Sequence, residues 1–219
     1  MPAGDQHHGG HPGGVPGHRG ATRLNEPADP GTPLRLVVRT DGAARGNPGP
    51  ASCGAVLIDA RRPDAYDPDA PPLVAIAKAL GRRTNNVAEY AGLIMALRSA
   101  LRIGAVAIDL RLDSRLIVEQ LNGRWRVRDP KIARLHAEAR RLLSGFGSWR
   151  ATHEPRVRNR AADHLANLAL DDPREAARYV EAVARASGHP EVAEALAASV
   201  TRLIDEAEGA PSGAGGQGG

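Results

Sequence analysis

Four acidic side chains stand where apolar segments end or helices begin. Asp41 and Asp113 each close an apolar run, whereas Glu89 and Asp163 lie among small apolar residues with helical spacing. Each one alone has an ordinary interpretation as a turn residue, a helix cap or a solvated helix position. In the parallel part of an α/β sheet, however, strand ends and the helix starts that follow them meet at one edge. Four carboxylates gathered there would repel one another unless divalent cations neutralised them, and oxygen ligands suit Mg²⁺ or Mn²⁺.

Hydrophobic periodicity places these residues in a mixed α/β pattern. Short apolar runs predict five strands, over 34–41, 53–58, 73–77, 105–113 and 148–153. Apolar residues at helical spacing predict four helices, over 87–103, 114–121, 130–143 and 158–170. The first strand is expected to end in a turn at Gly42. Three strands followed by alternating helices and strands predict a mixed sheet with helices on its faces, in a domain over residues 34–171.

The two ends of the chain differ from this domain in composition. Residues 1–33 are rich in glycine, proline and histidine and poor in large aliphatic side chains. Such a segment buries too little apolar surface to offset its ordering entropy, so we expect a disordered tail there and a second, glycine-rich one over 209–219. Residues 172–208 hold two amphipathic helical stretches that need a partner surface. Packing on the main domain is favoured over pairing with another chain.

The composition excludes several classes of protein. A single cysteine, Cys53, rules out a disulfide scaffold and a cysteine-based zinc site. No apolar run approaches the roughly 18 residues of a membrane span, and the N-terminus lacks the apolar stretch of a secretory signal. A cytoplasmic protein without membrane contact is therefore expected. The net charge of +4 permits nucleic-acid binding without demonstrating it.

Four segments, in this order, resemble the type 1 ribonuclease H family. They are Thr40–Pro50 with its Gly/Asn/Pro loop after Asp41, Arg83–Tyr90 with Thr-Asn-Asn-Val-Ala-Glu, Leu112–Ser114, and Asn159–Asn167. A lone Asp-Ser or Ala-Asp pair carries no information, but the four segments together on the expected strand and helix ends are specific. The resemblance covers about residues 34–171. It implies a ribonuclease H-like fold: a five-stranded mixed sheet, its first three strands antiparallel, flanked by helices and followed by a C-terminal helical extension.

The resemblance also implies an endoribonuclease that hydrolyses the RNA strand of RNA/DNA hybrids. Two Mg²⁺ ions, or Mn²⁺ in their place, would be held by four catalytic carboxylates: Asp41, Glu89, Asp113 and Asp163. Two such ions clamp the attacking and leaving oxygens of an in-line displacement, which leaves a 5′-phosphate and a 3′-hydroxyl. A fifth residue is expected to assist the attacking water or product release. His153 matches the family's mobile histidine by its spacing from Asp163, and Arg156 matches a subgroup with arginine at this place and is slightly favoured.

Recognition of a hybrid requires contact with ribose 2′-hydroxyl groups, because that group distinguishes RNA from DNA. By resemblance, Asn47, Asn85 and Asn86 would face the shallow minor groove of the hybrid. Asparagine is also common in turns and helix caps, so each has a structural interpretation beside the functional one. Thr84 is expected to bind a phosphate of the DNA strand, with a purely structural role equally open.

The chain departs from the best-known bacterial form of the family, which inserts a basic, tryptophan-containing handle between two central helices. Only residues 122–129 separate those helices here, and Arg124–Arg128 still interleaves three arginines with Trp125. Contact with the DNA backbone and simple packing of Trp125 remain equally open for this segment. The short form resembles actinobacterial and archaeal members, some of which carry a C-terminal phosphatase domain. No such domain or activity is expected here.

Two other functions compete with a ribonuclease. A non-catalytic hybrid-binding module is disfavoured, because it would tolerate the loss of carboxylates that are all present. Another nuclease of the same broad fold is disfavoured, because such enzymes lack the Thr-Asn-Asn-x-Ala-Glu segment and the Gly-Asn-Pro-Gly loop. A monomer is expected.

Overall fold

A computed structural model describes residues 32–189 and 197–209 of the 219-residue chain. The tails predicted over 1–33 and 209–219 lie outside these described residues, apart from residues 32, 33 and 209. Among the described helices, none is long and apolar enough to cross a bilayer.

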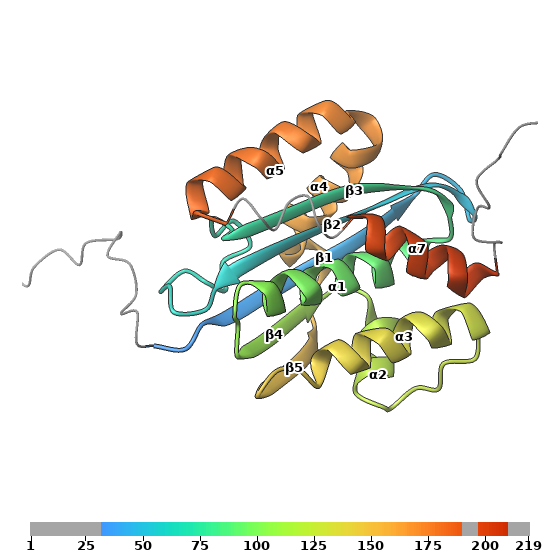
Figure 1. Ribbon diagram of the computed structural model, residues 1–219, viewed down its shortest axis with the longest axis horizontal. Coiled ribbons are helices and arrows are strands. Elements are labelled where there is room, and N and C mark those ends of the chain that lie inside the picture. Colours follow the sequence, from blue (N-terminus) through green and yellow to red (C-terminus); the bar gives the residue numbers. More distant parts are fainter. Residues whose placement is uncertain (1–31, 190–196, 210–219) are drawn as a thin grey trace, which may run out of the picture. The chain divides into compact units, whose positions relative to one another are not determined.

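A five-stranded sheet carries the fold (Figure 1). Its strands lie in the order β3-β2-β1-β4-β5 and span Arg35–Ala44 (β1), Gly49–Asp59 (β2), Val74–Arg83 (β3), Ala107–Leu112 (β4) and Ser148–His153 (β5). The first three strands are antiparallel, and β4 runs parallel to both β1 and β5. The predicted mixed sheet, with three antiparallel strands first, is confirmed.

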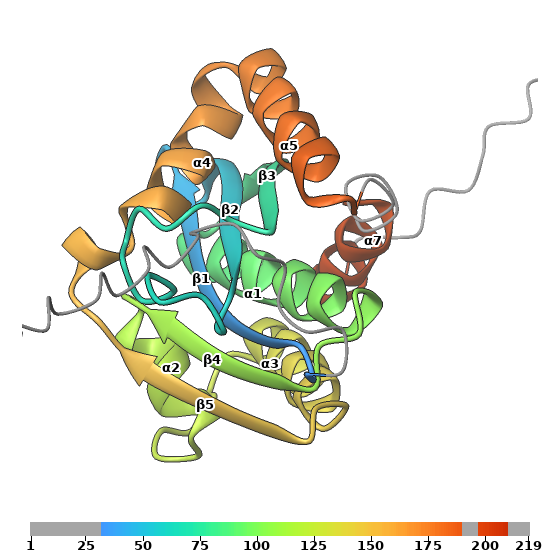
Figure 2. The ribbon, with the colours of Figure 1, turned by 90° about the vertical axis from the view of Figure 1, so that its left-hand side faces the viewer.

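Helices cover both faces of the sheet, as Figure 2 shows. They span Asn85–Arg102 (α1), Arg115–Leu121 (α2), Pro130–Leu143 (α3), Arg160–Asp171 (α4), Pro173–Ser187 (α5) and Ala197–Glu208 (α7), with a 3-10 turn at Arg156–Arg158 (η1). Alternation along β1 divides the core. Leu36 and Val38 pack into the cluster on the α1 side, whereas Val37 packs into the smaller cluster on the α4 side.

The first strand is longer than its apolar residues predicted. The expectation that it ends in a turn at Gly42 is wrong, because β1 stays paired with β2 as far as Ala44 and Ala51. The hairpin closes further on, where the Arg45 backbone N–H donates to the Pro50 carbonyl at 2.8 Å. Asp41 therefore lies inside a paired strand, where its backbone is rigid.

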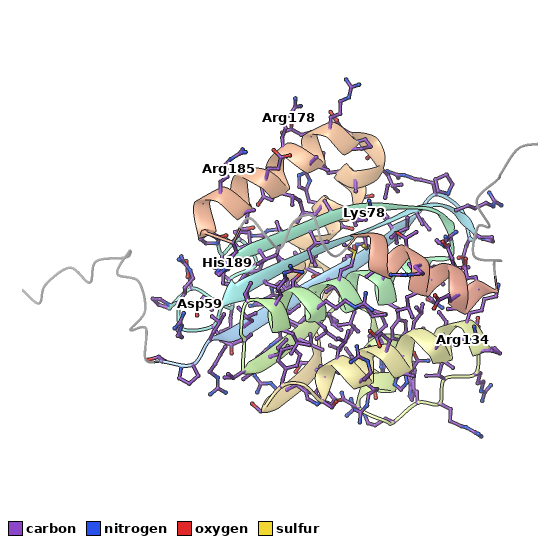
Figure 3. All side chains as sticks on the ribbon, viewed as in Figure 1. Asp59, Lys78, Arg134, Arg178, Arg185 and His189 are labelled. Atoms are coloured by element: carbon purple, nitrogen blue, oxygen red, sulfur yellow. The ribbon has the colours of Figure 1, made fainter. Side chains whose placement is uncertain are left out.

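The last two described helices pack on the same sheet domain. α5 lies against β3 and α4, whereas α7 lies against α1 and α3 and buries Val200 and Ile204 in the α1-side core. Arg83 at the end of β3 pairs with Asp205 of α7. On the outer side of α5, the side chains of Arg178 and Arg185 point away from the sheet (Figure 3).

Candidate active site

A cleft of about 300 Å³ lies where β1 and β4 end. Three of the four predicted carboxylates line it: Asp41, Glu89 and Asp113. Its other polar lining residues are Asn85, Ser114, Arg156 and Asn167. The cleft is therefore almost entirely polar, and its chemistry is that of oxygen ligands beside one guanidinium.

Two glycines allow the elements that carry the carboxylates to approach one another. A Cβ on Gly42 would lie 2.4 Å from the backbone nitrogen of Glu89, so only glycine lets α1 lie this close to β1. A Cβ on Gly54 would lie 2.2 Å from the carbonyl oxygen of Ala162, which lets α4 lie close on β2. Gly54 is paired with Asp41 across the hairpin. The two close contacts thus bring Glu89 and Asp163 to Asp41.

Helix caps place two further site residues. The hydroxyl of Thr84 accepts from the Val87 backbone N–H at 3.4 Å and starts α1, so Asn85 is its first residue. Ser114 accepts from the Ile117 backbone N–H at 3.5 Å and starts α2. The cap is thus Ser114 and not Asp113, whose carboxylate remains at the cleft.

The carboxylate cluster, defined as Asp41, Glu89, Asp113 and Asp163, is electrostatically strained. Burial raises the pKa of Asp41 to about 8, and the neighbouring Asp113 and a hydrogen bond with Asp163 add to the rise. Burial also raises the pKa of Glu89. Asp41 Oδ2 and Glu89 Oε2 are buried without a hydrogen-bond partner. Such groups need a positive partner, because burying an unpaired carboxylate is costly.

Arg156 is the positive charge that lies among these carboxylates. Its guanidinium donates to Asp163, and its Nη2 lies 3.9 Å from Asp41 Oδ2. Although partial burial opposes it, these acidic neighbours raise the pKa of Arg156. Within residues 32–189 and 197–209, no three acidic, histidine or cysteine side chains converge on one point that a cation would occupy. The oxygen donors, their charge and the unpartnered oxygens nevertheless fit a hard divalent cation.

The residues expected to read the substrate lie next to the cluster. Asn47 Oδ1 accepts from the Asn85 backbone N–H at 3.2 Å, and Asn85 Nδ2 donates to Glu89 Oε1 at 2.9 Å. Asn86 is exposed on the first turn of α1. The hairpin loop, the start of α1 and Glu89 therefore form one connected polar surface.

The two residues considered for the assisting role are placed differently. Arg156 contacts the carboxylate cluster, whereas His153 at the end of β5 is exposed and does not line the cleft. His153 instead lies near Glu119 of α2 and acts on it electrostatically. The structure thus brings Arg156, but not His153, to the carboxylates.

Two asparagines at the site had no predicted role. The fully buried Asn159 donates through Nδ2 to the Thr40 carbonyl at 2.9 Å and to Asp113 Oδ1 at 2.7 Å. Asn167 lines the cleft and donates to Asp163 Oδ1 at 3.3 Å. The signal for Asn167 was its helical spacing, four residues after Asp163, which puts both on one helix face. Asn159 carried no such local signal, because its partners lie far away in the sequence.

Comparisons with known proteins agree with this fold. A family profile described as "Reverse transcriptase-like" matches residues 39–169. The ribonuclease HI of Halobacterium salinarum is 46% identical over 138 residues, which cover 63% of this chain and 65% of that protein. The chain belongs to the type 1 ribonuclease H family. A bifunctional protein of Mycobacterium tuberculosis is 43% identical to this chain over 138 residues. The chain spans only 36% of the length of that relative.

Solved ribonuclease H structures share the architecture. The N-terminal RNase H domain of the Mycobacterium tuberculosis protein has a TM-score of 0.58 at 44% identity, over 63% of this chain and 99% of that one. RNase H1 of Halobacterium salinarum gives 0.57 at 46% identity, over 63% and 98%. LC11-RNase H1, solved in complex with an RNA/DNA hybrid, gives 0.56 at 34% identity, over 63% and 98%. The family and fold predictions are confirmed, and helices α5 and α7 lie beyond the residues that the family profile matches.

Proposed function

We propose that this protein is a divalent-metal-dependent endoribonuclease that hydrolyses the RNA strand of RNA/DNA hybrids. The observation that carries the proposal is the carboxylate cluster around the buried Asp41, in which the pKa of Asp41 rises to about 8 and two buried carboxylate oxygens lack a hydrogen-bond partner. Membership of the type 1 ribonuclease H family supports this reaction class, and one relative, LC11-RNase H1, has been solved with a hybrid.

Two Mg²⁺ ions, or Mn²⁺ in their place, would be held by the oxygens of Asp41, Glu89, Asp113 and Asp163. When bound, such ions supply activation of the attacking water and charge stabilisation of the departing 3′ oxygen, which leaves a 5′-phosphate and a 3′-hydroxyl. Asn159 and Asn167 orient Asp113 and Asp163 by donating hydrogen bonds to their carboxylates. Arg156 is the assisting residue that the geometry favours, because it already contacts Asp163. A role for His153 stays a prediction.

Recognition of the RNA strand would use the polar surface beside Glu89. The Asn47 side chain accepts a hydrogen bond from the Asn85 backbone N–H, and Asn86 is exposed next to them. Amide side chains both donate and accept, which matches a ribose 2′-hydroxyl. The Thr84 hydroxyl accepts from the Val87 backbone, so its own proton remains available for a phosphate oxygen of the DNA strand.

The first test is cleavage of an end-labelled RNA/DNA hybrid in Mg²⁺, run beside duplex DNA and single-stranded RNA. Asp41→Asn is the control for contaminating nuclease. We expect cleavage of the hybrid's RNA strand alone, lost in the variant and in EDTA. Hybrid binding without cleavage in either Mg²⁺ or Mn²⁺ would instead establish a binding module. Equal cleavage of duplex DNA would indicate a different nuclease of the same fold.

That the protein is cytoplasmic and monomeric remains a prediction.

A further inference from the structure

The sheet leaves a gap between the two strands that carry Asp41 and Asp113. β1 and β4 are paired from Arg35 and Ala107 only as far as Val38 and Leu110. Asp41 and Asp113 each lie three residues beyond that last pair. Backbone hydrogen bonds between β1 and β4 therefore do not set the separation of these two carboxylates. Something else must hold the diverging strand ends in place.

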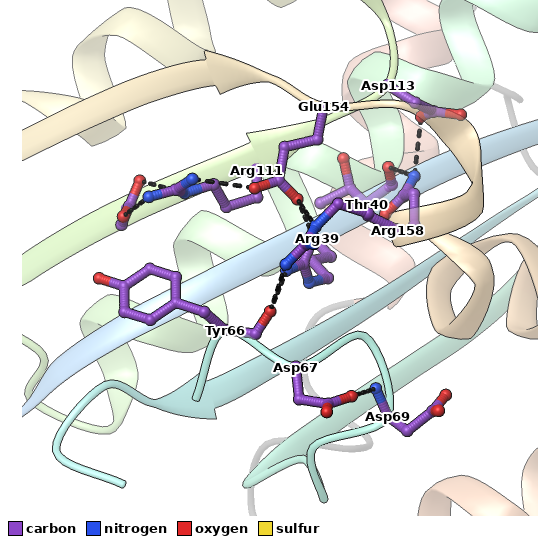
Figure 4. Close-up of polar contacts among 11 residues, drawn as sticks. Arg39, Thr40, Tyr66, Asp67, Asp69, Arg111, Asp113, Glu154 and Arg158 are labelled. Atoms are coloured by element: carbon purple, nitrogen blue, oxygen red, sulfur yellow. Dashed lines mark hydrogen bonds and ion pairs between the residues drawn. The ribbon is translucent and has the colours of Figure 1, made fainter. Parts of the chain in front are cut away.

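The side chain of Glu154 spans this gap (Figure 4). Its Oε2 accepts from Arg39 Nη1 at 2.5 Å, and its Oε1 accepts from Arg111 Nη1 at 2.9 Å. Arg39 lies two residues before Asp41 on β1, and Arg111 lies two residues before Asp113 on β4. One carboxylate thus joins the two strands two residues before each site carboxylate, on the same face. It adds to the link that Asn159 makes between the Thr40 carbonyl and Asp113.

Burial makes this bridge rigid. Arg39 is fully buried, Glu154 is only 8% exposed, and Arg39 Nη2 also donates to the Tyr66 carbonyl at 3.1 Å. The Glu154 backbone N–H donates to the Leu112 carbonyl at 2.8 Å, immediately before Asp113. Buried ion pairs contribute little net stability, because desolvation offsets their attraction. Their fixed geometry is the property that this arrangement uses.

We propose that Glu154, through Arg39 and Arg111, is a positioning residue that sets the separation of Asp41 and Asp113 and thereby the affinity of the cluster for divalent cations. The effect on turnover rests on the proposed function, whereas the effect on cation affinity does not. Groups that orient ligands from outside a metal site change its affinity or activity by about 10- to 100-fold.

Strand β4, which carries Arg111, offers a matched control in Asp109. It is also 8% exposed and bridges two arginines, Arg111 at 2.9 Å and Arg150 at 2.5 Å. Asp109 is paired with Val37, however, inside the stretch where backbone hydrogen bonds already join β1 and β4. Its loss removes a comparable ion pair of a buried acid but leaves both contacts of Glu154, with Arg39 and with Arg111, in place.

The experiment compares wild type, Glu154→Gln and Asp109→Asn on the full chain. Calorimetric titration with Mg²⁺ and with Mn²⁺, without nucleic acid, reports cation affinity. Steady-state cleavage of a hybrid separates kcat from KM. We expect Glu154→Gln to weaken cation binding by about 10- to 100-fold and to lower kcat with KM unchanged. Asp109→Asn should leave both at wild-type values.

A second variant distinguishes a loss of positioning from a loss of folding. Arg39→Met combined with Glu154→Gln removes both opposite charges, so no unpaired buried charge remains, yet the link to β1 is lost. It should show the same weakened cation binding. Wild-type affinity in both bridge variants, or an equal loss in Asp109→Asn, would overturn the proposal. If wild type cleaves no hybrid but Glu154→Gln still binds cations more weakly than Asp109→Asn, the proposed function fails and the positioning role stands.

Discussion

Two polar regions lie within a few residues of each other on the same strands, and they treat charge in opposite ways. In the carboxylate cluster, Arg156 is the cation that lies among four acids, and the pKa of Asp41 rises to about 8. In the paired network, which we define as Arg39, Asp109, Arg111, Arg150 and Glu154, each acid contacts at least two arginines. Burial alone would raise the pKa of Asp109 and Glu154, yet the arginines hold both below their usual range.

Burial is therefore not what separates the two regions, because Asp41, Asp109 and Glu154 are all less than 10% exposed. The difference is the partner. The paired network satisfies its charges internally and can only define geometry. The carboxylate cluster keeps an excess of negative charge that an external cation would satisfy. This excess lowers the stability of the folded protein and provides a site for cation binding.

Asp41→Asn, a change in the carboxylate cluster, should have the largest effect on the difference between the two regions. It removes a proposed cation ligand, so hybrid cleavage should fall by more than the roughly 100-fold that a residue outside the ligand shell costs. The same change relieves repulsion, so the metal-free protein should become more stable by about 1 kcal/mol or more. Cleavage rates and thermal unfolding in EDTA measure the two effects. A variant that loses both activity and stability would show that Asp41 is a structural residue.

Arg39→Ala, in contrast to Asp41→Asn, should lower the stability of the folded protein. It leaves the buried Glu154 with Arg111 and the more distant Arg158, and it opens a cavity in a fully buried position. Breaking a buried ion pair in this way costs about 3–5 kcal/mol of unfolding free energy. Urea unfolding monitored by circular dichroism gives the value, with Arg150→Ala as the exposed counterpart. A loss below about 1 kcal/mol would mean that Arg39 is not held by its buried pair.

The pH dependence of stability should reveal the strained cluster in the metal-free protein. The pKa of Asp41 is about 8 in the folded chain against an ordinary 3.8, so between these values the folded state binds more protons than the unfolded state. Stability must then fall as pH rises across that window, by up to about 1.4 kcal/mol per pH unit. Unfolding in EDTA between pH 5 and pH 8 tests this. Asp41→Asn should flatten the profile, and Mg²⁺ should restore wild-type stability at pH 8.

The elements that carry the site were predictable from local sequence. Strand periods put Asp41 on the first strand and Asp113 where the fourth ends, and the helices lie within two residues of their predicted bounds. The continuation of β1 past Gly42 was not predictable, because the pairing of Ala44 with Ala51 is a property of the hairpin and not of apolar content. Periodicity depends on large apolar side chains that alternate, and the last three residues of β1 are Gly42, Ala43 and Ala44.

The paired network was invisible for a different reason. Arg39 interrupts an apolar run, and its partner Glu154 lies 115 residues away, so no window of sequence contains both. The resemblance favoured Arg156 only slightly over His153, and it is tertiary position that separates the two. The two lie three residues apart in sequence. Arg156, in η1, contacts Asp163, whereas His153, at the end of β5, lies near Glu119.

Arg150→Ala should have the smallest effect and thereby sharpen the comparison within the paired network itself. The Arg150 side chain is 61% exposed, and its partner Asp109 keeps Arg111 when it is removed. An exposed pair of this kind is worth about 0.2–1 kcal/mol, so urea unfolding should detect little change. Cation affinity should not change at all, because Arg150 acts where the strands are already paired through Val37 and Asp109. A weakened cation site in Arg150→Ala would mean that the network transmits strain along its whole length, and that the position of Glu154 at the gap is not what matters.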